Sequence, residues 1–143
     1  MNAKHYVSLE AAKKLKELGC SQKCGYFYTN NGDIEDALSL YHKGNFPNNM
    51  DRHFARLSLL EAMDWLESKD IHLEIRMQHC KVKGDPYKIA DDDEYQWKYY
   101  FAICKGSDVM NPIVEVDKDD YVILYTDRNE CMQKAIEKEL ELL

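Results

Sequence analysis

The stretch that decides the fold is Ile71-His72-Leu73-Glu74-Ile75-Arg76-Met77-Gln78. Apolar and polar residues alternate along it, and a period of two is typical of a strand with one buried face and one solvated face. A shift of the register by one residue would expose four apolar side chains to water, at a cost of roughly 2 kcal/mol for each one. The sequence therefore specifies which side chains of this strand point outward.

Further strands are predicted on the carboxyl side of this stretch. Apolar and polar residues alternate again from Tyr95 to Cys104, and Tyr121 to Tyr125 forms a third predicted strand. Residues 113–116 form a short extended piece between them. The segment from Lys81 to Glu94 contains Gly, Pro and an acidic run, so it is interpreted as a long hairpin connection outside the sheet.

Three helices are predicted around these strands. The first runs from Leu9 to Leu18 after the capping residue Ser8, and the second from Leu59 to about Lys69. Ser58 and Glu61 have the Ser-x-x-Glu spacing of a capping box at the start of the second helix. A closing helix follows Asp127. Because the three strands follow one another without intervening helices, we expect an α+β two-layer domain with an antiparallel β-meander packed against helices.

The 143 residues are interpreted as a single domain, with residues 1–58 and 59–143 as its two parts. The first part holds the first helix, an aromatic strand at Tyr26 to Thr29 and a variable segment; the second is an α-β-β-β-α unit. Within residues 33–57, the spacing of Ile34, Ala37, Leu38 and Tyr41 fits a helix, but the same residues can pair back as a strand. Both alternatives stay open. Gly44 to Asp51 is predicted to be an exposed loop.

The charge distribution disfavours nucleic acid and anionic membranes as partners. The formal net charge is -7, and residues 59–143 carry 11 basic and 20 acidic residues. That part has the element order of a double-stranded-RNA-binding domain, but its last helix begins Asp127-Arg128-Asn129-Glu130, where such a domain needs basic residues. The amino end carries no signal-like apolar run and no stretch reaches the ~20 apolar residues of a membrane span, so we expect a cytoplasmic protein.

The five cysteines favour thiols over disulfides, since their number is odd and they are spread along the chain. Cys20 and Cys24 have a spacing found in some zinc sites, and the His79-Cys80 step offers further ligands, but no second close pair exists. We therefore expect no metal and no cofactor. The acidic run from Asp91 to Glu94 lacks the alternating ligands of a calcium loop and is interpreted as solvated.

Two kinds of function follow from the solvated face of the meander. His72, Glu74, Arg76, Lys98 and Tyr100 are predicted to project together, with Gln78 and Gln96, as a face that binds a protein partner, since Tyr and Arg are favoured in such contacts. The plainer interpretation is a solvent face with cross-strand ion pairs. The alternative function is an enzyme that uses His72 and Glu74 as an acid and base pair; the motifs of the common hydrolases and of phosphate loops do not occur.

A resemblance to known proteins rests on five stretches of the chain: Tyr6-Val7-Ser8-Leu9-Glu10-Ala11-Ala12-Lys13-Lys14-Leu15-Lys16, Tyr26-Phe27-Tyr28, Glu61-Ala62-Met63-Asp64-Trp65-Leu66-Glu67, Ile71-His72-Leu73-Glu74-Ile75 and Trp97-Lys98-Tyr99-Tyr100. Through them the chain resembles a group of small uncharacterised proteins encoded by phages and prophages of gut anaerobic bacteria. The resemblance implies a mobile-element origin only, because that group offers no activity or functional residue to carry over. We therefore expect a non-catalytic interaction or accessory protein that binds a basic host or phage protein through its sheet face or its acidic surface.

Overall fold

A computed structural model describes residues 3–21, 24–38, 52–108 and 110–143 of the chain. It has an α+β fold, as predicted. The elements in chain order are η1 (Ala3–His5), α1 (Leu9–Glu17), β1 (Tyr26–Thr29), β2 (Ile34–Asp36), β3 (His53–Ala55), α3 (Leu59–Ser68), β4 (Ile71–Lys83), β5 (Glu94–Lys105), β6 (Ile113–Val114) and α4 (Arg128–Glu141). Among the described residues, no helix is both long and apolar enough to cross a bilayer.

The three predicted helices are confirmed, and their first residues are fixed by side-chain caps. The Oγ atom of Ser8 accepts a hydrogen bond from the backbone N–H of Ala11 at the start of α1. At α3, Glu61 N–H donates to Ser58 Oγ and Ser58 N–H donates to Glu61 Oε1, both at 3.1 Å, which is the predicted capping box. Asp127 caps α4 in a similar way, so each helix begins where the sequence placed it.

The larger sheet has the strand order β4-β5-β6 and is antiparallel throughout. Leu73 lies opposite Ile103, and Ile75 opposite Phe101. These inner side chains pack against α4, whereas His72 and Glu74 are exposed on the other face. The predicted register of β4 is therefore confirmed.

A second, smaller sheet has the order β2-β1-β3. Its central strand is the predicted aromatic strand, and Ile34–Asp36 pairs back on it, so these three residues follow the strand alternative and not the helical one. Phe27 of β1 lies opposite Ala55 of β3 and is fully buried. Tyr41 and the loop predicted at Gly44 to Asp51 lie outside the described residues.

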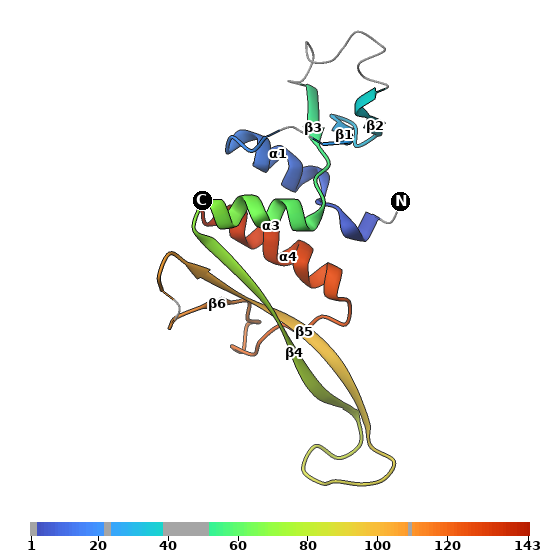
Figure 1. Cartoon of the computed structure of the whole chain (residues 1–143). Coiled ribbons are helices and arrows are strands. Elements are labelled where there is room, and N and C mark those ends of the chain that lie inside the picture. The colour runs from blue at the N-terminus through green and yellow to red at the C-terminus, as the bar shows by residue number, and fades with distance from the viewer. Residues whose placement is uncertain (1–2, 22–23, 39–51, 109) are drawn as a thin grey trace.

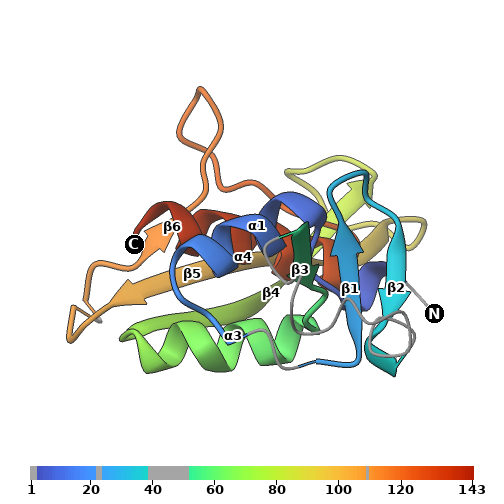
Figure 2. The same cartoon turned by 90° about the horizontal axis from the view of Figure 1, so that it is seen from above.

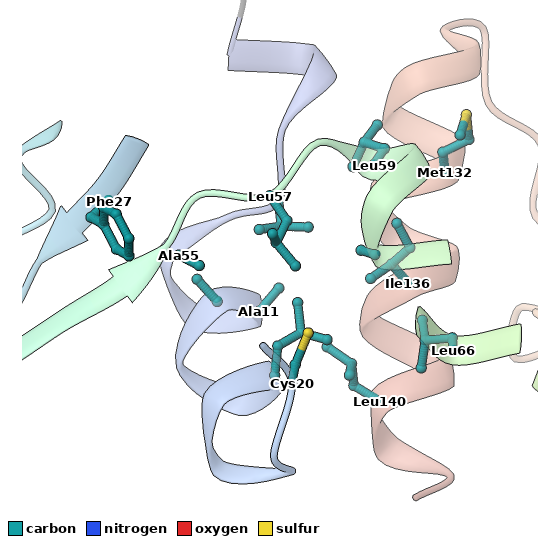
Figure 3. Close-up of a cluster of buried hydrophobic side chains, with 14 residues drawn as sticks. Ala11, Cys20, Phe27, Ala55, Leu57, Leu59, Leu66, Met132, Ile136 and Leu140 are labelled. Atoms are coloured by element: carbon teal, nitrogen blue, oxygen red, sulfur yellow. The ribbon is translucent and has the colours of Figure 1, made fainter. Parts of the chain in front are cut away.

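The helices lie between the two sheets (Figures 1 and 2). One core cluster joins α1, the small sheet, α3 and one side of α4; Figure 3 shows Phe27, Leu57, Leu66 and Ile136 pointing into it. A second cluster lies between α4 and the larger sheet, around Phe101. The predicted layer of helices on one face of the meander is present, and the small sheet covers the opposite side of that layer.

Two predictions about the larger sheet are wrong. Tyr121 to Tyr125 is not a strand, because Ile113–Val114 occupies the edge of β5 instead and leaves only single bridges, Val116 with Val122 and Tyr99 with Tyr125. The predicted connection is also too long at both ends, since β4 continues to Lys83 and β5 begins at Glu94. The loop proper is residues 84–93.

Candidate functional site

The outer half of the β4–β5 hairpin forms an arm, residues 77–99, that runs away from the helices (Figure 1). Its strands pair regularly from Met77 opposite Tyr99 to Lys81 opposite Tyr95, and a register shift follows between Lys81 and Lys83. At 13 and 12 residues, β4 and β5 are far longer than the strands of the small sheet. Both faces of the arm and the loop at its end therefore lie outside the packed body of the protein.

The residues of the predicted binding face lie together on the outer face of β4 and β5. Arg76 is opposite Tyr100, Gln78 is opposite Lys98, and His72 and Glu74 continue the same face toward the body. A hydrogen bond from Arg76 to Glu74, with 3.1 Å between Nη2 and Oε2, lowers the pKa of the Glu74 carboxyl group. The sequence thus placed all five residues correctly, and the exposed ion pair is what a solvated face also provides.

His72 and Glu74 do not form the acid and base pair that the enzyme alternative requires. His72 Nε2 lies 2.9 Å from Oδ1 of Asp70, and Glu74 pairs with Arg76. Both side chains are exposed. Two surface hollows of about 320 and 350 Å³ in the described part of the chain are lined by other residues, from α1, α3 and α4 and the segments beside them.

The inner face of the arm carries a row of aromatic rings. The His79 ring stacks on Trp97 with 4.6 Å between ring centroids and lies 4.9 Å from the ring of Tyr95. This face continues the apolar face that α4 covers nearer the body, but here Met77 is 60% exposed and Trp97 is 54% exposed. Period-two alternation placed these residues on the inner face; nothing in the sequence showed that the helices end before them.

An ion pair organises the loop at the tip of the arm. Lys81 Nζ lies 2.8 Å from Oδ2 of Asp93 and also donates to the carbonyl oxygen of Asp85 at 2.7 Å. The same Asp93 oxygen accepts the backbone N–H of Ala90 at 2.8 Å. The hydrogen bond from Lys81 lowers the pKa of Asp93, whose side chain is almost fully covered. The loop therefore has a defined shape fixed by polar contacts.

Two large apolar side chains stand out from this loop. Tyr87 is 94% exposed and Ile89 is 95% exposed. An isolated exposed apolar residue is ordinary on protein surfaces, but two within three residues on an ordered loop make a local apolar projection. Sequence reasoning missed them because it treated the whole connection as solvated; the only available signal was an apolar pair, Tyr87 and Ile89, inside a polar segment.

The five cysteines are free thiols, as the sequence predicts. No disulfide links the five cysteines, all of which lie among the described residues. Cys24 Sγ donates to the carbonyl oxygen of Tyr26 at 2.7 Å, and burial raises the pKa of the thiols of Cys20 and Cys24. In the described residues, no group of three or more His, Cys, Asp or Glu side chains is placed to hold a metal ion.

The chain matches no protein-family model, no curated protein sequence and no solved structure.

Proposed function

We propose that this protein is a non-catalytic binding module that engages a protein partner through the tip of its arm. The observation that carries this function is the nearly complete exposure of Tyr87 and Ile89 on a loop that Lys81 and Asp93 hold in shape. Large aromatic and aliphatic anchors dominate the energy of protein contacts when they enter a pocket of the partner. An ordered loop loses little conformational entropy when it binds, so these anchors are preorganised.

The charges around the tip indicate the chemistry of the partner. Asp85, Asp91 and Asp92 flank the two anchors along the chain, against Lys88; the charge of Lys81 is offset by Asp93 and that of Lys83 by Glu94. The tip is therefore a small apolar projection with an acidic rim. Its complement is an apolar pocket bordered by Lys or Arg on another protein, and the acidic rim speeds encounter with such a site at low salt.

The tip, and not the outer face, carries this function. Arg76 and Tyr100 are of residue types common in binding hot spots, but Arg76 is already paired with Glu74. The mobile-element origin that the sequence resemblance implies stays a prediction, and under it the basic partner is a host or phage protein.

The test uses variants of the tip with a matched control elsewhere. A photo-crosslinking residue at position 87 of the full chain is used to capture and identify the partner in cells that carry the gene, and the purified partner is then titrated with each variant. We expect Y87S/I89S to weaken binding at least tenfold. The control Y121S/M110S, which alters two other exposed side chains, should bind as the unaltered protein does.

Two results would contradict the proposed function. Equal loss of affinity in Y87S/I89S and in the control would show that the tip is not the contact. Unchanged affinity in Y87S/I89S for a partner crosslinked at position 87 would show that the anchors contribute nothing. A basic rim on the partner further requires the affinity to fall as the salt concentration rises.

A further inference from the structure

Among the residues that the structure describes, β4 has a strand neighbour on only one of its two edges. It is the outermost strand in the order β4-β5-β6, and in the described part of the chain its only strand neighbour is β5. The edge is 13 residues long and contains neither Pro nor Gly. Long regular edges of this kind are templates for pairing with another strand, and natural proteins usually shorten, bulge or cover them.

The backbone groups that this edge offers can be identified from β5. Tyr99 exchanges both backbone hydrogen bonds with Tyr125 at 2.7 Å, so its N–H and C=O point away from β4. In an antiparallel ladder, the N–H and C=O groups of two directly opposite residues either face each other or both face away from each other. Met77, opposite Tyr99, therefore directs its N–H and C=O away from β5, and so do Leu73, Ile75 and His79 at the same parity. The free edge thus presents donors and acceptors at every second residue from Ile71 to Lys81, where the pairing with β5 is regular.

We propose that this edge pairs with the same edge of a second copy of the chain, antiparallel and with Ile75 opposite Ile75. The two sheets then form one continuous six-stranded sheet about a two-fold axis. Such an isologous contact is the usual way in which identical chains associate. It uses the edge of β4 and not the loop tip, so it goes beyond the proposed function and does not depend on it.

Charge complementarity selects both the occupant and the register. With Ile75 on the axis, Glu74 of each copy lies opposite Arg76 of the other, so two ion pairs form across the axis at a position where opposite side chains come closest. The two nearest registers that keep the same faces aligned place Glu74 opposite Glu74 or Arg76 opposite Arg76. Within one copy these two residues already pair at 3.1 Å, so association exchanges an existing partner for an equivalent one and adds the backbone bonds.

The apolar side chains on the inner face favour the same register. In this register Leu73 of each copy lies opposite Met77 of the other, on the side of the sheet that carries the helices. Met77 is 60% exposed in a single copy. Pairing therefore covers the Met77 side chain of each copy, which is exposed in a single copy.

Sedimentation velocity of the full chain between roughly 1 and 200 µM tests this association, with a charge exchange as the decisive comparison. We expect the unaltered protein to dimerise within this range. E74R and R76E should each weaken the dimer at least tenfold, because each sets like charges opposite one another. The double variant E74R/R76E should restore the dissociation constant to within about threefold, because the two pairs are re-formed with their charges exchanged.

A backbone variant provides an independent test. M77P removes an N–H that β5 does not use, and proline is tolerated on strand edges, so we expect a folded monomer by circular dichroism. A protein that stays monomeric up to 200 µM overturns the association. A dimer that E74R and R76E leave unchanged, or that E74R/R76E fails to restore, overturns the register, and a dimer that persists in folded M77P overturns the use of this edge.

Discussion

The side chain of Lys81, in β4, contacts Asp93, the last residue of the loop at the end of the arm, with 2.8 Å between Nζ and Oδ2. Neither residue touches the core, yet their contact sets the position of everything between them, because each also binds backbone groups of the loop. A hairpin loop of this length is ordinarily variable in shape. Here one largely covered ion pair ties both ends of the loop to its backbone, through the carbonyl oxygen of Asp85 and the N–H of Ala90.

Asp93→Asn should release this loop without unfolding the protein. The amide of Ala90, which donates to Asp93, should exchange with solvent at least tenfold faster, while the melting temperature changes little because the arm is outside the core. Hydrogen exchange resolved by residue measures the first quantity, and thermal unfolding followed by circular dichroism measures the second. The control is Asp91→Asn, an exposed carboxyl group in the same loop, which should leave Ala90 protected; loss of protection there as well would show that the Lys81 contact is not responsible.

The same loop should loosen at low pH in the unaltered protein. The pKa of Asp93 is lowered in the folded state, chiefly by its hydrogen bond from Lys81. A carboxyl group of this kind stabilises the folded loop above its ordinary pKa of 3.8 and loses that effect as pH falls through the lowered value. Ala90 protection, corrected for the intrinsic pH dependence of exchange, should therefore drop below about pH 3.8, and in Asp93→Asn it should show no such step.

Gly84→Ala should have a similar local effect for a steric reason. Gly84 has a φ of +111°, and a Cβ atom there would stand 2.1 Å from Oδ1 of Asp93, so the carboxyl group must move. We expect faster exchange at Ala90, measured as above. Gly25→Ala is the matched control, since no atom of the described residues lies within 4 Å of the added atom. Unchanged Ala90 protection in Gly84→Ala would mean that Asp93 does not need its present position.

The register of β4 was predictable because a single property, the alternation of apolar and polar residues, decides it. One face of Ile71 to Ile75 packs against α4, so a slip would expose several apolar side chains at once. From Met77 onward the apolar side chains of the strand are exposed, so the alternation no longer separates a buried face from a solvated one. The extension to Lys83 pairs with β5 and ends at the contact between Lys81 and Asp93, residues 12 apart, which periodicity does not report.

The misplaced third strand has a different cause. Tyr121 to Tyr125 has the pattern of a strand, but a strand also needs a free edge beside it. Ile113–Val114 takes the edge of β5 at Ala102 and Ile103. The later segment is then left with one bridge to β5, from Tyr125 to Tyr99, and one bridge from Val122 to Val116. Competition between two segments for one edge depends on tertiary packing, so neither pattern alone reveals its outcome.

Arg56 should prove intolerant of its conservative replacement. It is buried, its guanidinium lies 4.0 Å from the centre of the Tyr6 ring, and its Nε donates to the hydroxyl of Tyr28. Lysine lacks the flat guanidinium that stacks on an aromatic ring, so Arg56→Lys should cost about 1 to 3 kcal/mol of unfolding free energy in urea titrations. Arg52→Lys, at an exposed position nearby, should cost less than about 0.5 kcal/mol.

The carboxyl group of Glu139 is the clearest conflict between this sequence and its fold. Its side chain lies on the buried side of α4 with 0% exposure, and neither oxygen has a hydrogen-bond partner among the described residues. Burial, with a smaller contribution from the charge of Glu67, raises its pKa to about 8. The folded protein therefore holds this proton at pH values where the unfolded chain, with an ordinary pKa near 4.5, has released it.

This difference predicts that stability falls as pH rises between about 4.5 and 8, by on the order of 3 to 5 kcal/mol across the window. Glu139→Gln should remove this slope, because it has no proton to lose, and Glu139→Leu should in addition be more stable at pH 8, because it buries no polar atom. Urea titrations of all three proteins at pH 5, 6, 7 and 8 measure this. Other titrating groups are common to the three, so only the differences between them count. If the unaltered protein and Glu139→Gln respond to pH in parallel, Glu139 is not the group that sets this dependence.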